Sequence, residues 1–165
     1  YEGGMRVPFI AAWAKSAETA WQMRLPTPSG QIRKGWGAIY DLFPTIAELL
    51  ELDVPEGHVV DGSSLKTLFA SSENRNKDRG FLMHFPRSNY FTVYRQGDWK
   101  LIYHYQPEED QSAMQLFDLR KDPYEQNDLV DVETNMADEL CSRMFAKLFR
   151  EGALYPVLKE GRRLP

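Results

Sequence analysis

The side chains that could carry out chemistry are few and scattered. His58 and His104 have no metal-ligand spacing to His84 or to a carboxylate cluster, which predicts ordinary surface or edge residues. The acidic run 108–110 is most simply a solvated loop, because a hard cation needs oxygens that are fixed in geometry rather than merely adjacent. The single Cys141 excludes an internal disulfide and a cysteine-based zinc site, and it leaves the compartment undecided.

His84 stands where a scaffold would present a recognition group. It belongs to an apolar run at 81–85 and precedes a loop that carries Arg87 and Asn89, and such loops are common positions for binding residues. The alternative interpretation is a strand-end histidine that is hydrogen-bonded to the backbone. Both interpretations depend on a sheet that ends at this position.

The second half of the chain has the pattern of an antiparallel meander backed by a helix. Four strands are predicted in quick succession, at 81–85, 90–94, 99–105 and 115–119. A short glycine-containing hairpin at 96–98 joins the second strand to the third. A helix is predicted over about 132–150, because apolar side chains recur one turn apart from Met136 to Leu148. A helix packed on a sheet is the expected pairing.

Strand alternation adds expectations about single side chains. We expect Trp99 to pack under the helix and Lys100 to point outward, because successive side chains of a strand face opposite ways. Asp98 is expected to stabilise the hairpin turn. The aromatic residues of these strands are explained by core and edge packing rather than by a carbohydrate-stacking platform.

The first half of the chain predicts pieces of a larger α/β domain. The apolar run 7–13 suits a strand covered on both faces in a mostly parallel sheet, and the prolines and glycines of 16–37 indicate a loop. Asp41 supplies an acceptor for the free amides of a helix that continues to about Leu52. The polar run 71–78 is the best boundary between this part and the sheet.

The bulk composition describes a globular chain of 165 residues and argues against two kinds of partner. The net charge of -4 comes from 20 basic and 24 acidic residues spread along the chain, so there is no cationic cluster for nucleic acid. No apolar run approaches the roughly 20 residues that a membrane-spanning helix needs. The chain opens at Tyr1 without an initiator methionine, which suggests further protein upstream.

Four motifs, in this order, resemble the type I sulfatases of the alkaline-phosphatase superfamily. They are Glu2-Gly3-Gly4-Met5-Arg6-Val7-Pro8 with the apolar run behind it, Tyr40-Asp41-Leu42-Phe43-Pro44-Thr45 with Asp61-Gly62-Ser63-Ser64-Leu65, Arg95-Gln96-Gly97-Asp98-Trp99-Lys100-Leu101-Ile102, and Leu116-Phe117-Asp118-Leu119 with Asp122-Pro123-Tyr124-Glu125-Gln126-Asn127. Each motif is short, but four in the family's order resemble the C-terminal portion of these enzymes. One departure is Trp13-Ala14-Lys15, where the family usually has Trp-Pro-Gly.

This resemblance implies an α/β fold in two parts. Residues 1–72 would be the C-terminal end of the catalytic α/β domain, and residues 78–165 an α+β subdomain of four antiparallel strands with a terminal helix. The intact protein would be a calcium-dependent sulfuric ester hydrolase that uses formylglycine, in a periplasmic or secreted location. Its upstream catalytic domain would be the partner of this chain, and a sulfated carbohydrate or small molecule its substrate.

The reacting groups of that family are expected to be missing here. The family's formylglycine arises in a Cys/Ser-x-Pro/Ala-x-Arg motif, whereas Cys141 is followed by Ser142, Arg143 and Met144 in a helical pattern, which predicts a core cysteine. The family's calcium ligands and active-site lysine belong upstream of Tyr1. We therefore expect no catalytic residue, no metal ligand and no activity in this chain alone.

Two groups of residues would lie near the substrate. The candidate contacts to the organic part of the substrate are His84, Arg87 and Asn89. A second group would follow an active-site loop, where it either shapes the sulfate pocket or provides a tight turn and a buried ion pair; it contains Glu2, Gly3, Gly4 and Arg6. Two other functions stay open, namely a related phosphonate or phosphate ester hydrolase and a non-catalytic carbohydrate-binding or scaffolding module.

Overall fold

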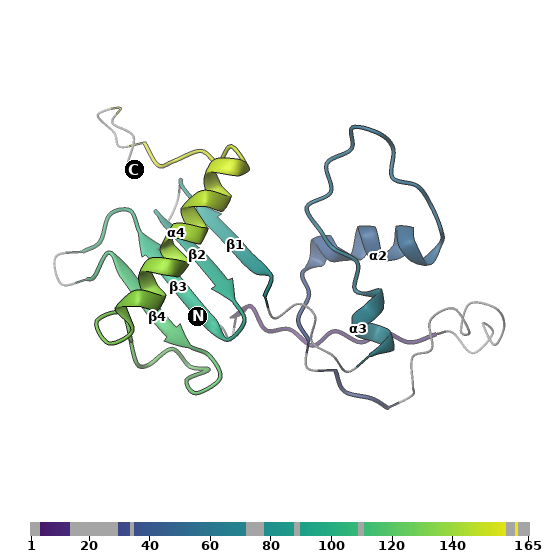
Figure 1. The fold of residues 1–165 in the computed structure, drawn as a ribbon, viewed down its shortest axis with the longest axis horizontal. Helices are drawn as coiled ribbons and strands as arrows, with labels where there is room; N and C mark the ends of the chain where they lie inside the picture. The colour runs from purple at the N-terminus through teal and green to yellow at the C-terminus, as the bar shows by residue number, and fades with distance from the viewer. Residues whose placement is uncertain are drawn as a thin grey trace. The chain divides into compact units, whose positions relative to one another are not determined.

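The computed structural model describes residues 4–13, 30–33, 35–71, 78–87, 90–108, 111–157 and 161. In chain order their elements are the 3-10 helix η3 (Ile39–Asp41), helices α2 (Leu42–Leu49) and α3 (Lys66–Ala70), strands β1 (Gly80–Phe85), β2 (Phe91–Gln96), β3 (Trp99–His104) and β4 (Met114–Asp118), and helix α4 (Thr134–Arg150) (Figure 1). The elements predicted for the second half are confirmed, with their ends shifted by no more than two residues.

Strands β1 to β4 form one antiparallel sheet in chain order, which is the predicted meander. The hairpin between β2 and β3 turns at Gly97, whose φ of 59° lies in the left-handed region that glycine adopts without strain. The carbonyl of Asp98 accepts a hydrogen bond of 2.7 Å from the amide of Leu119, which joins this turn to the end of β4. The sheet and its C-terminal helix confirm the predicted α+β fold of this part.

Helix α4 covers one face of the sheet (Figure 1). In the middle of that face Leu101 and Leu116 are completely buried. They pack against a stripe of α4 whose buried side chains recur three and four residues apart, so that one side of the helix faces the sheet along its length; these are Ala137, Leu140, Met144 and Leu148. Trp99 packs against the same cluster, as alternation predicted.

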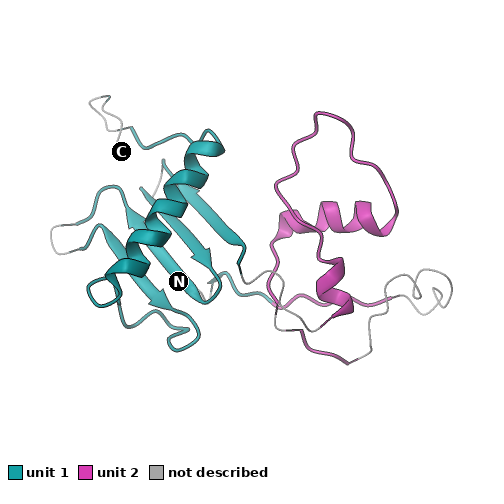
Figure 2. Cartoon of the chain, in the orientation of Figure 1, with its two compact units in different colours: residues 1–7, 78–165 teal, residues 8–77 magenta. Residues whose placement is uncertain are grey.

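The chain divides into two compact units after residue 77 (Figure 2). One unit contains residues 1–7 and 78–165, and the other contains residues 8–77. The first seven residues therefore group with the sheet rather than with the elements of the first half. The assignment of 1–72 to a catalytic domain and of 78–165 to a subdomain stays a prediction.

The apolar run 7–13 is not a strand, so the predicted strand is wrong for this chain. Its side chains include Val7, Phe9 and Ile10, which are 78%, 59% and 87% exposed. A strand buried on both faces needs neighbouring strands to satisfy its backbone groups, and no strand of the described residues pairs with this run. Most of the predicted loop at 16–37 lies outside the described residues.

A buried carboxylate joins the two halves of the second motif. Asp41 is 0% exposed, and its carboxylate accepts hydrogen bonds from the amide of Ala38 at 2.7 Å and from the amide of Ser63 at 2.9 Å. Asp41 makes no side-chain cap to α2. The capping prediction is therefore wrong for α2, whereas at the start of η3 the carboxylate does accept the free amide of Ala38; its other oxygen accepts from a segment 22 residues away.

Two further contacts bring the same segment against the helix. The hydroxyl of Thr45 donates to the carbonyl of Asp41 and accepts a hydrogen bond of 2.9 Å from the amide of Leu65. A Cβ at Gly62 would lie 2.2 Å from the carbonyl oxygen of Tyr40, so the backbones can approach this closely only where there is no side chain. The aspartate and the glycine of the second motif thus serve one local structure.

Candidate functional site

The third and fourth motifs meet at a buried ion pair. Nζ of Lys100 on β3 lies 2.9 Å from each carboxylate oxygen of Glu125, and the two side chains are 2% and 0% exposed. The expectation that Lys100 points into solvent is therefore wrong. The side chain of Lys100 does point to the face of the sheet opposite α4, as alternation requires. Its ammonium group is nevertheless buried there, against the turn that carries Glu125.

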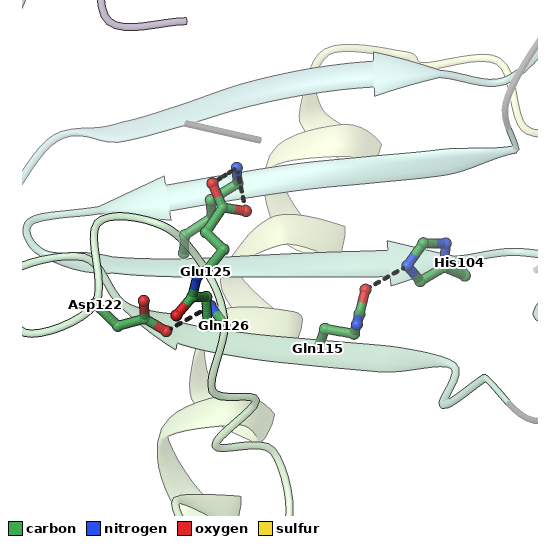
Figure 3. A network of polar contacts seen from close by, with 6 residues as sticks. His104, Gln115, Asp122, Glu125 and Gln126 are labelled. Carbon is green, nitrogen blue, oxygen red and sulfur yellow. Dashed lines mark hydrogen bonds and ion pairs between the residues drawn. The ribbon is translucent and has the colours of Figure 1, made fainter. Parts of the chain in front are cut away.

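The turn after β4 is shaped so that Glu125 reaches Lys100. The carboxylate of Asp122 accepts a hydrogen bond of 2.7 Å from the amide of Gln126 (Figure 3). It accepts a second one of 2.7 Å from the amide of Asn127. These hydrogen bonds hold the pKa of Asp122 below its ordinary value, and the bond from the amide of Asn127 has the largest effect. Glu125 has a φ of 57°, a left-handed conformation that is uncommon for a residue with a side chain. In this conformation its side chain forms the ion pair with Lys100.

Asp128 fastens the end of this connection to the sheet. Its Oδ1 accepts hydrogen bonds from the amide of Leu116 at 2.9 Å and from the amide of Val130 at 3.0 Å. The amide of Leu129 donates to the carbonyl of Leu116 at 2.8 Å. The carboxylates of Asp122, Glu125 and Asp128 are therefore all engaged in contacts within the chain.

His84 lies near the end of β1, opposite Thr92 of β2, on the same face of the sheet as α4. Its Nδ1 is 2.6 Å from Oγ1 of Thr92, and its Nε2 is 2.7 Å from the carbonyl oxygen of Leu154, which follows α4. The rings of Tyr105 and Tyr155 stand edge-on to the imidazole, with centroid distances of 6.0 and 6.3 Å. Both ring nitrogens are thus engaged within the chain, and a contact between His84 and a substrate stays a prediction.

The other predicted site residues are less enclosed. Arg87 is exposed in the turn after β1. Gly4 and Arg6 are also exposed, and a Cβ at Gly4 would meet no atom within 4 Å. The remaining ones lie outside the described residues: Glu2, Gly3 and Asn89. The proximity of these groups to a substrate stays a prediction.

A tyrosine that the sequence did not single out stands behind His84. Oη of Tyr105 is 2.9 Å from Oγ1 of Thr92; Thr92 is completely buried, and Tyr105 is 8% exposed. Burial raises the pKa of Tyr105 to about 12, while the hydrogen bond to Thr92 acts in the opposite direction. Tyr105 therefore keeps its proton at neutral pH. The aromatic residues that alternate along these strands predicted only that Tyr105 would pack in the core or at an edge. The tertiary structure shows that its hydroxyl lies beside Oγ1 of Thr92.

We expect Tyr105 to make the stability of the chain fall at alkaline pH. Because its pKa in the folded chain lies above the ordinary value of 10, its contribution is complete below pH 10 and declines as the pH rises toward 12. Two pH units correspond to roughly 2–3 kcal/mol. Urea unfolding of Tyr105→Phe should therefore show a smaller alkaline decline than the unmodified chain. Tyr124→Phe changes a tyrosine that is 78% exposed and should leave the decline unaltered; the same result in both variants would refute the assignment.

Within the ranges given above, no three His, Cys, Asp or Glu residues are placed to hold a metal ion. Cys141 is partly buried in α4 against the core cluster, and burial, followed by the nearby Asp138, raises the pKa of its thiol. No helix in the described part of the chain is long and apolar enough to cross a membrane.

The fold and the motifs define the class of protein: this is an α/β chain whose second half is a four-stranded antiparallel sheet with a helix on one face. Two human proteins share sequence with it over 85 residues: steryl-sulfatase at 32% identity and arylsulfatase D at 33%. The matched residues are 52% of this chain, and 13% and 12% of the two relatives. The chain therefore spans only a small part of their length. No family model matches the chain.

Three solved structures have a fold similar to that of about two thirds of this chain. The crystal structure of Ps i-CgsB is 25% identical, with a TM-score of 0.52 over 65% of this chain and 23% of that one. Its complex with k-i-k-neocarrahexaose is 24% identical, with a TM-score of 0.55 over 73% and 26%. The structure of BT4656 with D-glucosamine-2-N,6-O-disulfate is 22% identical, with a TM-score of 0.50 over 67% and 23%. Sequence and fold together support the resemblance of this chain to the C-terminal portion of the type I sulfatases.

Proposed function

We propose that this chain is part of a sulfuric ester hydrolase that acts on a sulfated carbohydrate. The observation that carries the proposal is the sequence match to two human sulfatases over 85 residues. The substrate class is supported by two structures of similar fold, one solved with k-i-k-neocarrahexaose and one with D-glucosamine-2-N,6-O-disulfate. Both of those ligands are carbohydrates, and the second carries sulfate groups.

In this proposal the reacting groups lie in the upstream catalytic domain. Cleavage of a sulfate ester calls for a nucleophile, a cation that offsets charge on the sulfate oxygens, and an acid for the leaving alcohol. The described residues do not form a metal site, and the thiol of Cys141 is packed in a helix. Calcium and formylglycine would therefore come from outside this chain, which would contribute structure and substrate contacts.

The substrate contacts would come from the turn after β1. The exposed guanidinium of Arg87 can bind two oxygens of a sulfate group at once, as it does with phosphate and carboxylate. Asn89 would add an amide that both donates and accepts. His84 would contact the substrate only after its Nε2 is released from the carbonyl of Leu154.

Arg87→Ala is expected to weaken substrate binding in the protein that includes the upstream domain. A hydrogen bond to a charged group contributes about 1.5–3 kcal/mol, so KM for the sulfated sugar should rise roughly tenfold or more with little change in kcat. Arg120→Ala is the matched control, because it removes another exposed arginine, in the turn after β4. It should leave both constants unchanged. An unaltered KM in Arg87→Ala would remove Arg87 from the site.

The reaction class is tested separately with matched sulfate and phosphate esters. We expect the protein with its upstream domain to release sulfate, and preferential cleavage of phosphate or phosphonate esters would favour the related hydrolase. The 165-residue chain alone is expected to show no binding of the sulfated sugar in calorimetry. Detectable binding would favour the non-catalytic carbohydrate-binding module instead.

A further inference from the structure

The segment 153–157 after α4 is fastened to the sheet at His84. The carbonyl of Leu154 accepts the hydrogen bond from Nε2 at 2.7 Å. Beside it, the ring of Tyr155 stacks on Phe145 of α4 at a centroid distance of 6.5 Å and stands edge-on to Tyr105 at 6.3 Å. Pro156 is fully buried. The segment is therefore packed against the domain, although it has no regular secondary structure of its own.

The hydrogen bonds around His84 have only one consistent direction when the imidazole is neutral. A carbonyl can only accept, so Nε2 carries the proton and Nδ1 has none. Nδ1 then accepts from the hydroxyl of Thr92, 2.6 Å away. Since the Thr92 proton is committed to His84, its oxygen accepts from Tyr105 at 2.9 Å. Each group thus donates one hydrogen bond to the next, from Tyr105 to Thr92, from Thr92 to His84, and from His84 to the carbonyl of Leu154.

The donor-to-acceptor direction of these hydrogen bonds matters because the groups that form them are buried. Thr92 is completely buried and Tyr105 nearly so, so a donor left without an acceptor there would cost more than an exposed one. The hydroxyl of Tyr105 carries its proton at neutral pH, so it can donate to Oγ1 of Thr92. A reversed order would leave the Leu154 carbonyl facing an imidazole nitrogen without a proton.

We propose that His84 is a positioning residue that holds segment 153–157 to β1 through its Nε2–H group, which donates to the carbonyl of Leu154. Because His84 is three residues before Arg87, this attachment sets the position of the turn in which Arg87 lies. The attachment stands on the hydrogen bonds alone. Its consequence for substrate binding through Arg87 rests on the proposed function.

Nitrogen-15 NMR of the imidazole rings in the 165-residue chain tests the attachment directly, because the chain has three histidines. His84 is expected in the Nε2–H form, with Nδ1 unprotonated, and replacement of each histidine in turn assigns the signals. An Nδ1–H form, or an even mixture of the two forms, would overturn the proposal. This measurement uses the unmodified chain, so it decides the matter even where a variant fails to fold.

Backbone order parameters of Leu154, Tyr155 and Val157 give a second readout. We expect values near 0.85 in the unmodified chain and below about 0.6 in His84→Phe, which keeps a ring but has neither nitrogen. His104→Phe is the matched control, because it loses a hydrogen bond to Gln115 in the same sheet and should leave the segment rigid.

A rigid segment 153–157 in His84→Phe, with β1 intact, would contradict the proposal. Loss of order confined to that segment, with β1 and β2 unchanged, would support it, since a general structural role would affect the strands as well. Neither NMR measurement depends on sulfate-ester hydrolysis. The proposed function can therefore fail while the attachment holds, and the reverse.

Discussion

Replacing Lys100 with methionine should lower the free energy of unfolding of the chain by about 3–5 kcal/mol, because it removes the ammonium group that lies against the buried carboxylate of Glu125. The two side chains are 2% and 0% exposed, and Nζ is 2.9 Å from both carboxylate oxygens. The loss should be visible in urea unfolding at neutral pH. It should be accompanied by disorder in the turn after β4, since the ion pair holds Glu125 at its positive φ.

The control for Lys100 is a lysine in an exposed ion pair. Lys147 lies 3.4 Å from Glu151, with side-chain exposures of 30% and 46%, and Lys147→Met should cost less than about 1 kcal/mol. A double variant, Lys100→Met with Glu125→Leu, should recover much of the stability, because two apolar side chains can replace a buried ion pair at little cost. A double variant as unstable as Lys100→Met would show that packing, rather than the buried charge, explains the loss.

The second large effect is expected from Asp41→Ala. The substitution leaves the amides of Ala38 and Ser63 without their carboxylate acceptor, and hydrogen bonds to a charged group contribute about 1.5–3 kcal/mol each. We expect the unit 8–77 to lose roughly 3 kcal/mol of local stability. Hydrogen exchange at the amide of Ser63 should then accelerate about a hundredfold or more, since about 1.4 kcal/mol corresponds to a factor of ten.

Asp53→Ala provides the matched control for Asp41. It makes the same chemical change at an exposed aspartate after α2, and it should leave the exchange of Ser63 unaltered. If Ser63 stayed protected in Asp41→Ala, the carboxylate would not be the group that holds the loop. Comparable exchange in the two variants would lead to the same conclusion.

The parts of the fold that sequence predicted depend on near neighbours in the chain. The period of two in β2 and β3 and the three- and four-residue spacing in α4 are local patterns, and all three elements lie where those patterns placed them. The hairpin at Gly97 has a local cause as well. The family resemblance also rests on short motifs, and the sulfatase matches confirm it.

The predictions that failed concern groups whose partners lie far away in the sequence or are missing from the described residues. Alternation placed Lys100 on the correct face, but it did not show that Glu125, 25 residues later, closes that face. The carboxylate of Asp41 accepts from Ser63, 22 residues later, as well as from the amide of Ala38, and it makes no cap to α2. The run 7–13 has the composition of a buried strand, yet it pairs with no strand of the described residues.

His84 shows the same division between local and long-range information. The sequence by itself determined that a histidine stands at a strand end before a loop. Only the tertiary structure decided that its two nitrogens face Thr92 and a carbonyl 70 residues away. The physical reason is that strand and helix patterns specify which way a side chain faces, whereas the group it meets there depends on how separate segments pack. For the sheet and α4, the direction in which each side chain faces was enough to predict the packing. For Lys100, Asp41 and His84, the interactions depend on the partner that each side chain meets.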